Sequence, residues 1–243
     1  MIGTNEIGYA KIPGDLSGPS GEVYLTGQDT RGNRCDVTVP WEWLDEDRNI
    51  LAVRGLLNFE PADLIAEAER LNVWQRSTVV GADQASRRDI YQRNTHEFAV
   101  RGWHRNGDPH GLPRHWPALA PHEAGLIAAG SAAAILYANI NPHARVTRDE
   151  GYRLLRYREG EQFGEHIDAV QGHPVLGHRR LSLLIYLNGG DELDGGETVF
   201  TKQCISVKPE PGLAVLFPSG MTHPHVGSTV AAGTKYVIVS WFS

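Results

Sequence analysis

The sequence from Tyr152 onward is divided into short runs of β-forming residues by clusters of Gly, Pro and Asp. Short strands with turn signals at regular spacing are typical of an all-β sandwich or barrel. The predicted strands include residues 181–187, 198–200, 213–217 and 236–242. This part of the chain is therefore expected to form a β-barrel, and any functional side chains on it should follow the two-residue period of strands.

Helical patterns precede this region. Pro61 stands where a first helical residue tolerates proline, and Leu64 and Ala68 follow at helical spacing. Pro121 similarly opens an Ala-rich segment over residues 124–140. As a helix that segment would be about 25 Å long, which is short of the ~30 Å hydrocarbon core of a membrane. We therefore expect a buried helix in a soluble protein that does not span a membrane.

Charge and cysteine usage narrow the function classes. The 243 residues carry a formal net charge of −6, which argues against a general nucleic-acid binder because such proteins are normally basic. Two cysteines do not make the dense disulfide framework of a small secreted protein. The first residues also lack a basic stretch followed by an apolar one, so no signal peptide is predicted and a cytoplasmic location is expected.

The organisation that these patterns predict is a single α+β unit in three parts. Residues 1–45 are expected to form an N-terminal arm with short strands, and residues 46–145 a supporting region of helices and strands. Within the supporting region, residues 101–122 are rich in His, Trp and Pro and are the best candidate for a lid over a substrate. Residues 146–243 are expected to form the β-barrel core.

One short motif could hold a metal. His166 and Asp168 are two residues apart on a predicted strand, so both side chains project from one face. A pair of this kind can equally be a half-buried polar strand edge, because the motif is short. A ferrous site would need a second imidazole from another strand. His223 and His225 are the candidates near the C-terminus.

Five blocks of sequence in a fixed order give the motif a context. Over about residues 153–243 they resemble the prolyl-4-hydroxylase-like family of 2-oxoglutarate oxygenases. The blocks are Arg156-Tyr157-x-x-Gly160-x-x-Phe163-x-x-His166-x-Asp168, Ile185-Tyr186-Leu187-Asn188, Gly195-Gly196-Glu197-Thr198-Val199-Phe200, Val207-x-Pro209-x-x-Gly212-x-Ala214-x-x-Phe217 and His225-x-Gly227-x-x-Val230-x-x-Gly233-x-Lys235-Tyr236.

The resemblance implies a double-stranded β-helix (jelly-roll) core with N-terminal supporting helices. It implies a catalytic metal triad of His166, Asp168 and His225, with His223 an outer neighbour. The cofactors that it implies are Fe(II), 2-oxoglutarate as co-substrate and O₂, with ascorbate as a reductant. A carboxylate at position 168 favours hydroxylation, because relatives that halogenate have a small residue there.

The co-substrate site follows from the same resemblance. Lys235, ten residues after His225, would pair with the distal carboxylate of 2-oxoglutarate. Tyr157, Tyr186 and Thr198 match positions that line the family's co-substrate pocket. On a strand, Lys235 shares its face with Val237, Val239 and Trp241, which would form one wall of the pocket.

Substrate recognition is predicted only in outline. The candidates are an arginine on the strand of Tyr157, two arginines before the strand of Tyr186 and a tryptophan on the strand of Lys235, namely Arg153, Arg179, Arg180 and Trp241. The leading hypothesis is hydroxylation of a C–H bond of a small molecule, an amino acid or a biosynthetic intermediate. The alternatives are a peptidyl or protein prolyl hydroxylase and a jelly-roll that holds a metal and binds a ligand without turnover. The sequence makes no prediction of the oligomeric state.

Overall fold

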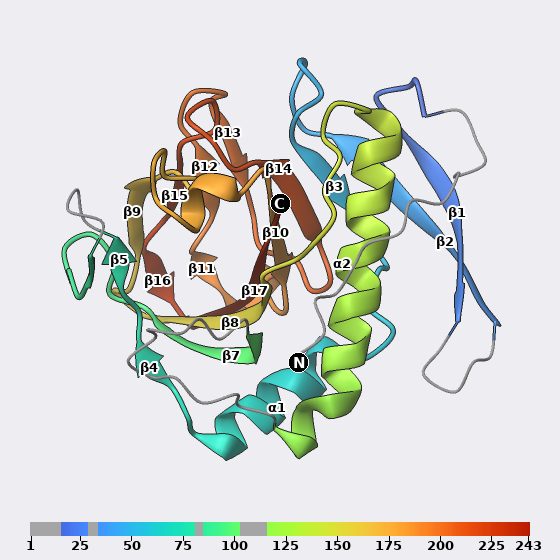
Figure 1. Ribbon diagram of the computed structural model, residues 1–243. Helices are drawn as coiled ribbons and strands as arrows, with labels where there is room; N and C mark the ends of the chain where they lie inside the picture. Colours follow the sequence, from blue (N-terminus) through green and yellow to red (C-terminus); the bar gives the residue numbers. More distant parts are fainter. Residues whose placement is uncertain (1–15, 29–33, 81–84, 103–115) are drawn as a thin grey trace.

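Two facing β-sheets form the body of the protein, and two helices cover the outer side of the larger sheet (Figure 1). The computed structural model describes residues 16–28, 34–80, 85–102 and 116–243. The structure confirms the predicted fold class, a mixed architecture that is rich in strands and has few helices.

The larger sheet has nine strands, each antiparallel to its neighbours. In spatial order they are β1 (Ser20–Gln28), β2 (Arg34–Trp43), β3 (Leu51–Val53), β14 (Ala214–Pro218), β10 (Leu181–Tyr186), β17 (Thr234–Phe242), β8 (Gly151–Arg158), β7 (His96–Gly102) and β4 (Gln75–Arg76). The non-sequential order brings strands from both ends of the chain into one sheet.

The smaller sheet has four strands and lies across from β10, β17 and β8 (Figure 1). Its order is β13 (Ile205–Val207), β12 (Thr198–Phe200), β15 (His225–Gly227) and β9 (Phe163–His166). Two further antiparallel pairs are β11 (Asp194–Gly195) with β16 (Val230–Ala232), and β5 (Val79–Val80) with β6 (Ser86–Arg87).

The helices pack on the side of the larger sheet that faces away from the smaller one. These helices are α1 (Pro61–Leu71) and α2 (Ala120–Ile140). The described residues also form three short 3-10 helices elsewhere in the chain order, which are η1 (Pro117–Leu119), η2 (Leu176–His178) and η3 (Gly190–Glu192). Leu64 and Ala68 of α1 are buried, as their spacing predicts. Leu126 and Ala129 of α2 are buried as well. By length and composition the segment Pro117–Ile140 could cross a membrane, and half of its most apolar window is buried inside the fold.

Two hydrophobic clusters result, one on each side of the larger sheet. Alternate residues of β17 divide between them: Val237 and Val239 pack toward the smaller sheet, whereas Ile238 and Phe242 pack toward the helices. This is the two-residue alternation that strands impose, here in a strand covered on both faces. The inner cluster lines the space between the two sheets, where the functional candidates lie.

The structure differs from the expected three parts in two respects. β1 and β2 are nine and ten residues long, not short, and β3 connects them to the larger sheet. The sheet also takes β4 and β7 from the expected supporting region, so residue 146 marks no boundary within it. Residues 103–115 of the expected lid lie outside the described residues, and residues 117–119 after them form η1.

Candidate metal centre

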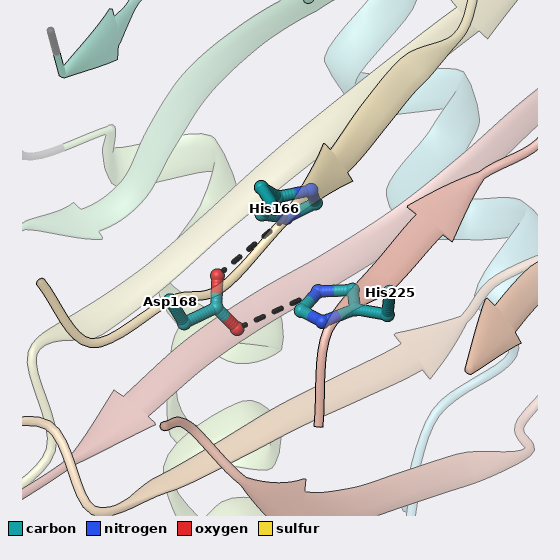
Figure 2. Close-up of side chains that lie close together, drawn as sticks. All are labelled: His166, Asp168 and His225. Carbon is teal, nitrogen blue, oxygen red and sulfur yellow. Dashed lines mark ion pairs between the residues drawn. The ribbon is translucent and has the colours of Figure 1, made fainter. Parts of the chain in front are cut away.

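Two imidazoles and one carboxylate meet between the two sheets (Figure 2). His166 ends β9 and His225 begins β15, and the register of these neighbouring strands places the two residues directly opposite each other. Asp168 follows just beyond the end of β9. Its Oδ1 lies 3.7 Å from Nε2 of His166 and its Oδ2 lies 3.7 Å from Nε2 of His225. All three potential ligand atoms lie within 4.8 Å of one another.

Backbone carbonyls fix the orientation of both rings. Nδ1 of His166 is 2.9 Å from the carbonyl oxygen of Gly164, and Nδ1 of His225 is 3.1 Å from that of His223. Because a carbonyl oxygen only accepts hydrogen bonds, each Nδ1 carries the proton and donates. Each Nε2 is left with a lone pair, and these are the atoms that face Asp168 (Figure 2).

The electrostatics of the site keep His166 and Asp168 in the forms that bind a metal. Burial, reinforced by the neighbouring His225, lowers the pKa of His166 to about 3, so that imidazole is neutral at physiological pH. Burial alone would raise the pKa of Asp168, but the two imidazoles, the Arg179 guanidinium and the Ser182 hydroxyl outweigh it and hold that pKa below its usual range. Two neutral imidazoles and a carboxylate are the donor set that suits Fe(II) while leaving positions open for other ligands. The residues present therefore fit the expected ferrous ion.

A second layer of residues supports Asp168. Ser182, on β10, donates a hydrogen bond from Oγ to Asp168 Oδ2 at 2.7 Å, and its Oγ also lies 2.8 Å from that of Ser219. The backbone amide of Asp168 donates to the carbonyl oxygen of Ser219 at 3.1 Å. Contacts of this kind orient metal ligands and commonly affect metal affinity. The sequence patterns did not identify either serine.

Aromatic rings fix the two histidines. The Phe163 ring stacks on the His166 ring with centroids 3.5 Å apart and an interplanar angle of 10°. The Phe217 and His225 rings form a T-shaped pair with centroids 4.8 Å apart and an interplanar angle of 70°. His223 is also buried, but its contribution to the site is the backbone carbonyl that orients His225.

A cavity of about 540 Å³ opens beside the triad. One wall is built from alternate residues of two neighbouring strands, as the strand period predicts. The residues are Lys235, Val237, Val239 and Trp241 of β17, and Arg153, Leu155 and Tyr157 of β8. His166, Asp168 and His225 lie on the same cavity, so a molecule bound there would reach the metal centre.

Lys235 is a deeply buried cation in this wall. Only 1% of it is exposed, and Nζ donates to the carbonyl oxygen of Gly196 at 2.6 Å and lies 4.7 Å from the centroid of the Tyr157 ring. Within the part of the chain that the structure describes, Lys235 makes no ion pair with a carboxylate. Burial lowers its pKa to about 7, although Glu197 acts in the opposite direction. A cation in this setting is suited to an anionic ligand from outside the chain.

The other two co-substrate candidates, Tyr186 and Thr198, lie near Lys235. Tyr186 donates a hydrogen bond from its hydroxyl to Thr198 Oγ1 at 2.7 Å. The Tyr186 ring lies 5.5 Å from Nζ of Lys235 but is not part of the cavity wall, whereas Thr198 is. Tyr186 therefore contacts the site through Thr198 and Lys235.

Three of the four predicted substrate residues line the cavity, and the fourth does not. Arg153 and Trp241 line the cavity. Arg179 lines it too, but its guanidinium forms hydrogen bonds of 2.9 and 2.7 Å with the two carboxylate oxygens of Glu150 and lies 3.6 Å from the centroid of the Trp241 ring. Arg180 is exposed and outside the cavity wall, because adjacent residues of an extended chain project in opposite directions.

The opposite side of the cavity is formed by a region that the sequence patterns did not single out. It includes β5, part of β6 and the segment 89–93, with Val79, Val80, Asp89 and Arg93 on the cavity. A bridge between Arg93 and Phe163 joins this segment to the free edge of β9. Short irregular segments have no periodicity that would predict such a position.

The class that this fold and site define is a jelly-roll with a mononuclear two-histidine, one-carboxylate metal centre. Comparison with known proteins gives the family. Residues 152–243 match the sequence profile of the 2OG-Fe(II) oxygenase superfamily, so this part of the chain is similar to that superfamily and to its prolyl-4-hydroxylase-like proteins. The cofactors of that superfamily are Fe(II) and 2-oxoglutarate, with O₂ as the oxidant. The predicted resemblance is confirmed.

The relatives and a solved structure show how far the similarity extends. A PKHD-type hydroxylase of Psychrobacter sp. (strain PRwf-1) is 37% identical over 91 residues, which is 35% of this chain and 34% of that protein. Prolyl 3-hydroxylase 2 of Mus musculus is 35% identical over 75 residues, 29% of this chain and 10% of that protein. The chain thus spans about a third or less of the length of these relatives.

The structural similarity covers more of the chain than the sequence similarity does. The crystal structure of the viral collagen prolyl hydroxylase from Paramecium Bursaria Chlorella virus-1, in complex with 2OG, superimposes with a TM-score of 0.56. The match covers 82% of this chain and 98% of that one at 18% identity. At that identity the likeness establishes the fold, a double-stranded β-helix, and leaves activity to be argued from the site.

Proposed function

We propose that this protein is an Fe(II)- and 2-oxoglutarate-dependent dioxygenase that hydroxylates a C–H bond of a small molecule. The observation that carries the proposal is one cavity that holds both a complete set of ferrous ligands and a buried lysine without a carboxylate partner among the described residues. A protein that merely held a metal would not need the second feature.

Each residue has a part in this proposal. His166, Asp168 and His225 would hold Fe(II) through two Nε2 atoms and a carboxylate oxygen. Lys235 would bind the distal carboxylate of 2-oxoglutarate, with Tyr157 and Thr198 beside it. When bound, the iron and co-substrate supply the oxidation: 2-oxoglutarate and O₂ become succinate and CO₂, and one oxygen atom enters the C–H bond.

The protein itself orients the metal ligands and excludes water from the co-substrate end of the cavity. The Ser182 hydroxyl fixes one oxygen of Asp168, and the two backbone carbonyls fix the imidazoles. Leu155, Val237 and Val239 give the co-substrate end of the cavity an apolar wall, which strengthens a pairing between Lys235 and a carboxylate by excluding water. The protein thereby orients the reactants so that oxidation is directed at one substrate.

A small substrate is favoured by the shape of the site. The cavity volume of about 540 Å³ is in the range of small-molecule sites, and 2-oxoglutarate would fill part of it. β5, β6 and the segment 89–93 close one side. The net charge of −6 favours neither nucleic acid nor anionic membranes as partners, and two cysteines suit a cytoplasmic location.

A peptidyl-prolyl substrate is the second candidate, and the names of the relatives favour it. The Mus musculus relative is a prolyl 3-hydroxylase, and the superimposed viral structure is a collagen prolyl hydroxylase. A peptide would have to enter past β5, β6 and the segment 89–93, because these line the cavity.

Substrate-stimulated succinate release tests the proposal. The purified protein would be supplied with Fe(II), 2-oxoglutarate and O₂, and then with free amino acids or with proline-containing peptides. We expect free amino acids to stimulate succinate release, and the Asp168→Ala variant to give none. Stimulation by peptides alone would establish the prolyl hydroxylase instead. If no compound stimulated succinate release, the protein would instead be one that binds a ligand without turnover.

A further inference from the structure

A carboxylate shared by two arginines forms part of the cavity wall. Glu97, on β7, accepts hydrogen bonds from Arg93 Nη2 at 2.7 Å, from Arg153 Nη1 at 3.2 Å and from Ser77 Oγ at 3.1 Å. Glu97 and both arginines line the cavity. Two guanidinium groups against one carboxylate leave this cluster with a net positive charge that faces the space beside the triad.

The two arginines differ in how many of their donors are used. Arg93 donates from Nε to Thr95 Oγ1, from Nη1 to the carbonyl oxygen of Thr78 and from Nη2 to Glu97, and only 11% of its side chain is exposed. Its guanidinium also lies 4.5 Å from the centroid of the Phe163 ring, which itself stacks on His166. All three nitrogens of the Arg93 guanidinium are therefore hydrogen-bonded within the wall, and its ring contact supports Phe163 beside His166.

Arg153 has hydrogen-bond donors that no described residue uses. Its one hydrogen bond to a residue that the structure describes is the bond from Nη1 to Glu97, and 39% of its side chain is exposed. A guanidinium has five N–H donors in a planar fork that matches a carboxylate. Glu97 holds one arm of the fork and leaves the other arm on the cavity. Arg179, another arginine on the cavity, donates from Nε and Nη2 to Glu150 and from Nη1 to the carbonyl oxygen of Asp168.

The register of the sheet relates Arg153 to the strand that supports Asp168. Arg153 is opposite Val239, which is opposite Leu184 on β10. Ser182, two residues from Leu184, is the residue that bonds Asp168. Two strand spacings, about 10 Å, thus separate the backbone of Arg153 from the strand that supports the metal ligand. That span suits a small molecule.

The same register separates Arg153 from the proposed co-substrate site. Lys235 is opposite Tyr157, four residues further along β8. At the rise of a β-strand, the backbones of the two residues are about 13 Å apart along the sheet. Lys235 and the free arm of Arg153 are therefore two separate cationic places on one cavity, one for each of two anionic ligands.

We propose that the free arm of Arg153 binds a carboxylate group of the primary substrate, so that the substrate is a small carboxylic acid such as a free amino acid. Glu97 is the positioning residue that orients the guanidinium. This inference rests on the proposed function and narrows its substrate class. It distinguishes a free acid from an internal proline of a peptide, whose α-carboxyl group is part of an amide and carries no charge.

A panel of matched compounds tests this inference. Free amino acids and other small carboxylic acids would be compared with their amides and with proline-containing peptides blocked at both ends, by substrate-stimulated succinate release. At least one acid should stimulate release, with its amide at least 10-fold weaker. In the Arg153→Gln variant, kcat/KM for that acid should fall about 10- to 100-fold, the effect of losing a charge-assisted hydrogen-bonded pair. Arg158→Gln, on the same strand but exposed and outside the cavity wall, is the matched control and should match the wild type.

A second readout separates this inference from the function on which it rests. The visible band that Fe(II) and 2-oxoglutarate give without oxygen should be equally strong, at the same 2-oxoglutarate concentration, in Arg153→Gln and in the wild type. A weaker 2-oxoglutarate affinity in Arg153→Gln would assign that residue to the co-substrate and overturn the inference. Stimulation by an amide as strong as that by its acid, stimulation by blocked peptides, or stimulation by no acid of the panel would overturn the inference as well. Absence of the band from the wild type would refute the proposed function itself.

Discussion

Replacing Lys235 by Met should make the metal-free protein more stable. Burial lowers the pKa of Lys235 from 10.5 to about 7, and at 1.36 kcal/mol per pKa unit this corresponds to about 5 kcal/mol. The variant also loses the hydrogen bond to the carbonyl oxygen of Gly196, and an unpaired buried carbonyl costs about 1–3 kcal/mol. Met fills a similar volume, so the net gain in the free energy of unfolding should be about 2–4 kcal/mol at pH 6.

The gain should depend on pH in a defined direction. Between pH 7 and pH 10.5 the unfolded wild-type chain keeps a proton on Lys235 that the folded chain has released. Stability of the wild type therefore rises with pH through this window, because the unfolded state binds more protons there. The variant has no such group, so its advantage should be full at pH 6 and should shrink as the pH approaches 10.5.

Urea unfolding of both proteins at pH 6 and pH 10 measures this difference. With a slope near 2 kcal/mol/M, the midpoint at pH 6 should lie about 1–2 M higher for Lys235→Met. The same variant should bind 2-oxoglutarate at least 100-fold more weakly, since it has lost the cation for the distal carboxylate. A variant that is less stable than the wild type at pH 6, or a stability difference that does not change with pH, would refute the reasoning.

Three further substitutions test other parts of the structure. Asp168→Ala should abolish hydroxylation in an assay of product and succinate, and full turnover would mean that the triad is wrongly assigned. Ser182→Ala should weaken Mn(II) binding about 10-fold in a calorimetric titration, because Asp168 loses its oriented hydrogen bond, whereas Ser240→Ala, on the outer face of β17, should leave the affinity unchanged. Gly130→Ala should lower the free energy of unfolding by about 1–3 kcal/mol although Ala favours helices, because its Cβ would collide with the Tyr152 hydroxyl; an equal or higher stability in thermal unfolding would contradict this packing.

The parts of the site that were predictable are those set by local periodicity. Lys235, Val237, Val239 and Trp241 alternate along one strand, and all four line the cavity. β12 spans the residues predicted for it, 198–200. Such features depend on the two-residue period of a strand, which neighbouring residues are sufficient to define.

The unpredicted parts depend on how the sheet is assembled. The hydrogen bond between Ser182 and Asp168 joins β10 to the segment after β9, and the one between Arg153 and Glu97 spans 56 residues of the chain. Neither contact leaves a pattern in the residues near it. The lengths of β1 and β2 were underestimated for a related reason, since their pairing with each other and with β3 outweighs the Gly and Asp residues in that stretch.

The choice between the two late histidines combines both kinds of information. The resemblance assigns His225 as the ligand, and the register places it directly opposite His166. His223, two residues earlier, supplies the carbonyl oxygen that holds Nδ1 of His225. An alanine at position 223 keeps that carbonyl, whereas an alanine at position 225 removes the ligand atom itself.

The central claim is that this triad binds Fe(II) and 2-oxoglutarate together, and one spectroscopic measurement tests it most directly. Fe(II) and 2-oxoglutarate would be added to the metal-free protein in the absence of oxygen, and the weak visible charge-transfer band of the chelate recorded. We predict that the band appears, that His225→Ala abolishes it and that His223→Ala retains it. A well-folded wild-type protein without the band, or a band that survives His225→Ala and is lost in His223→Ala, would contradict the account.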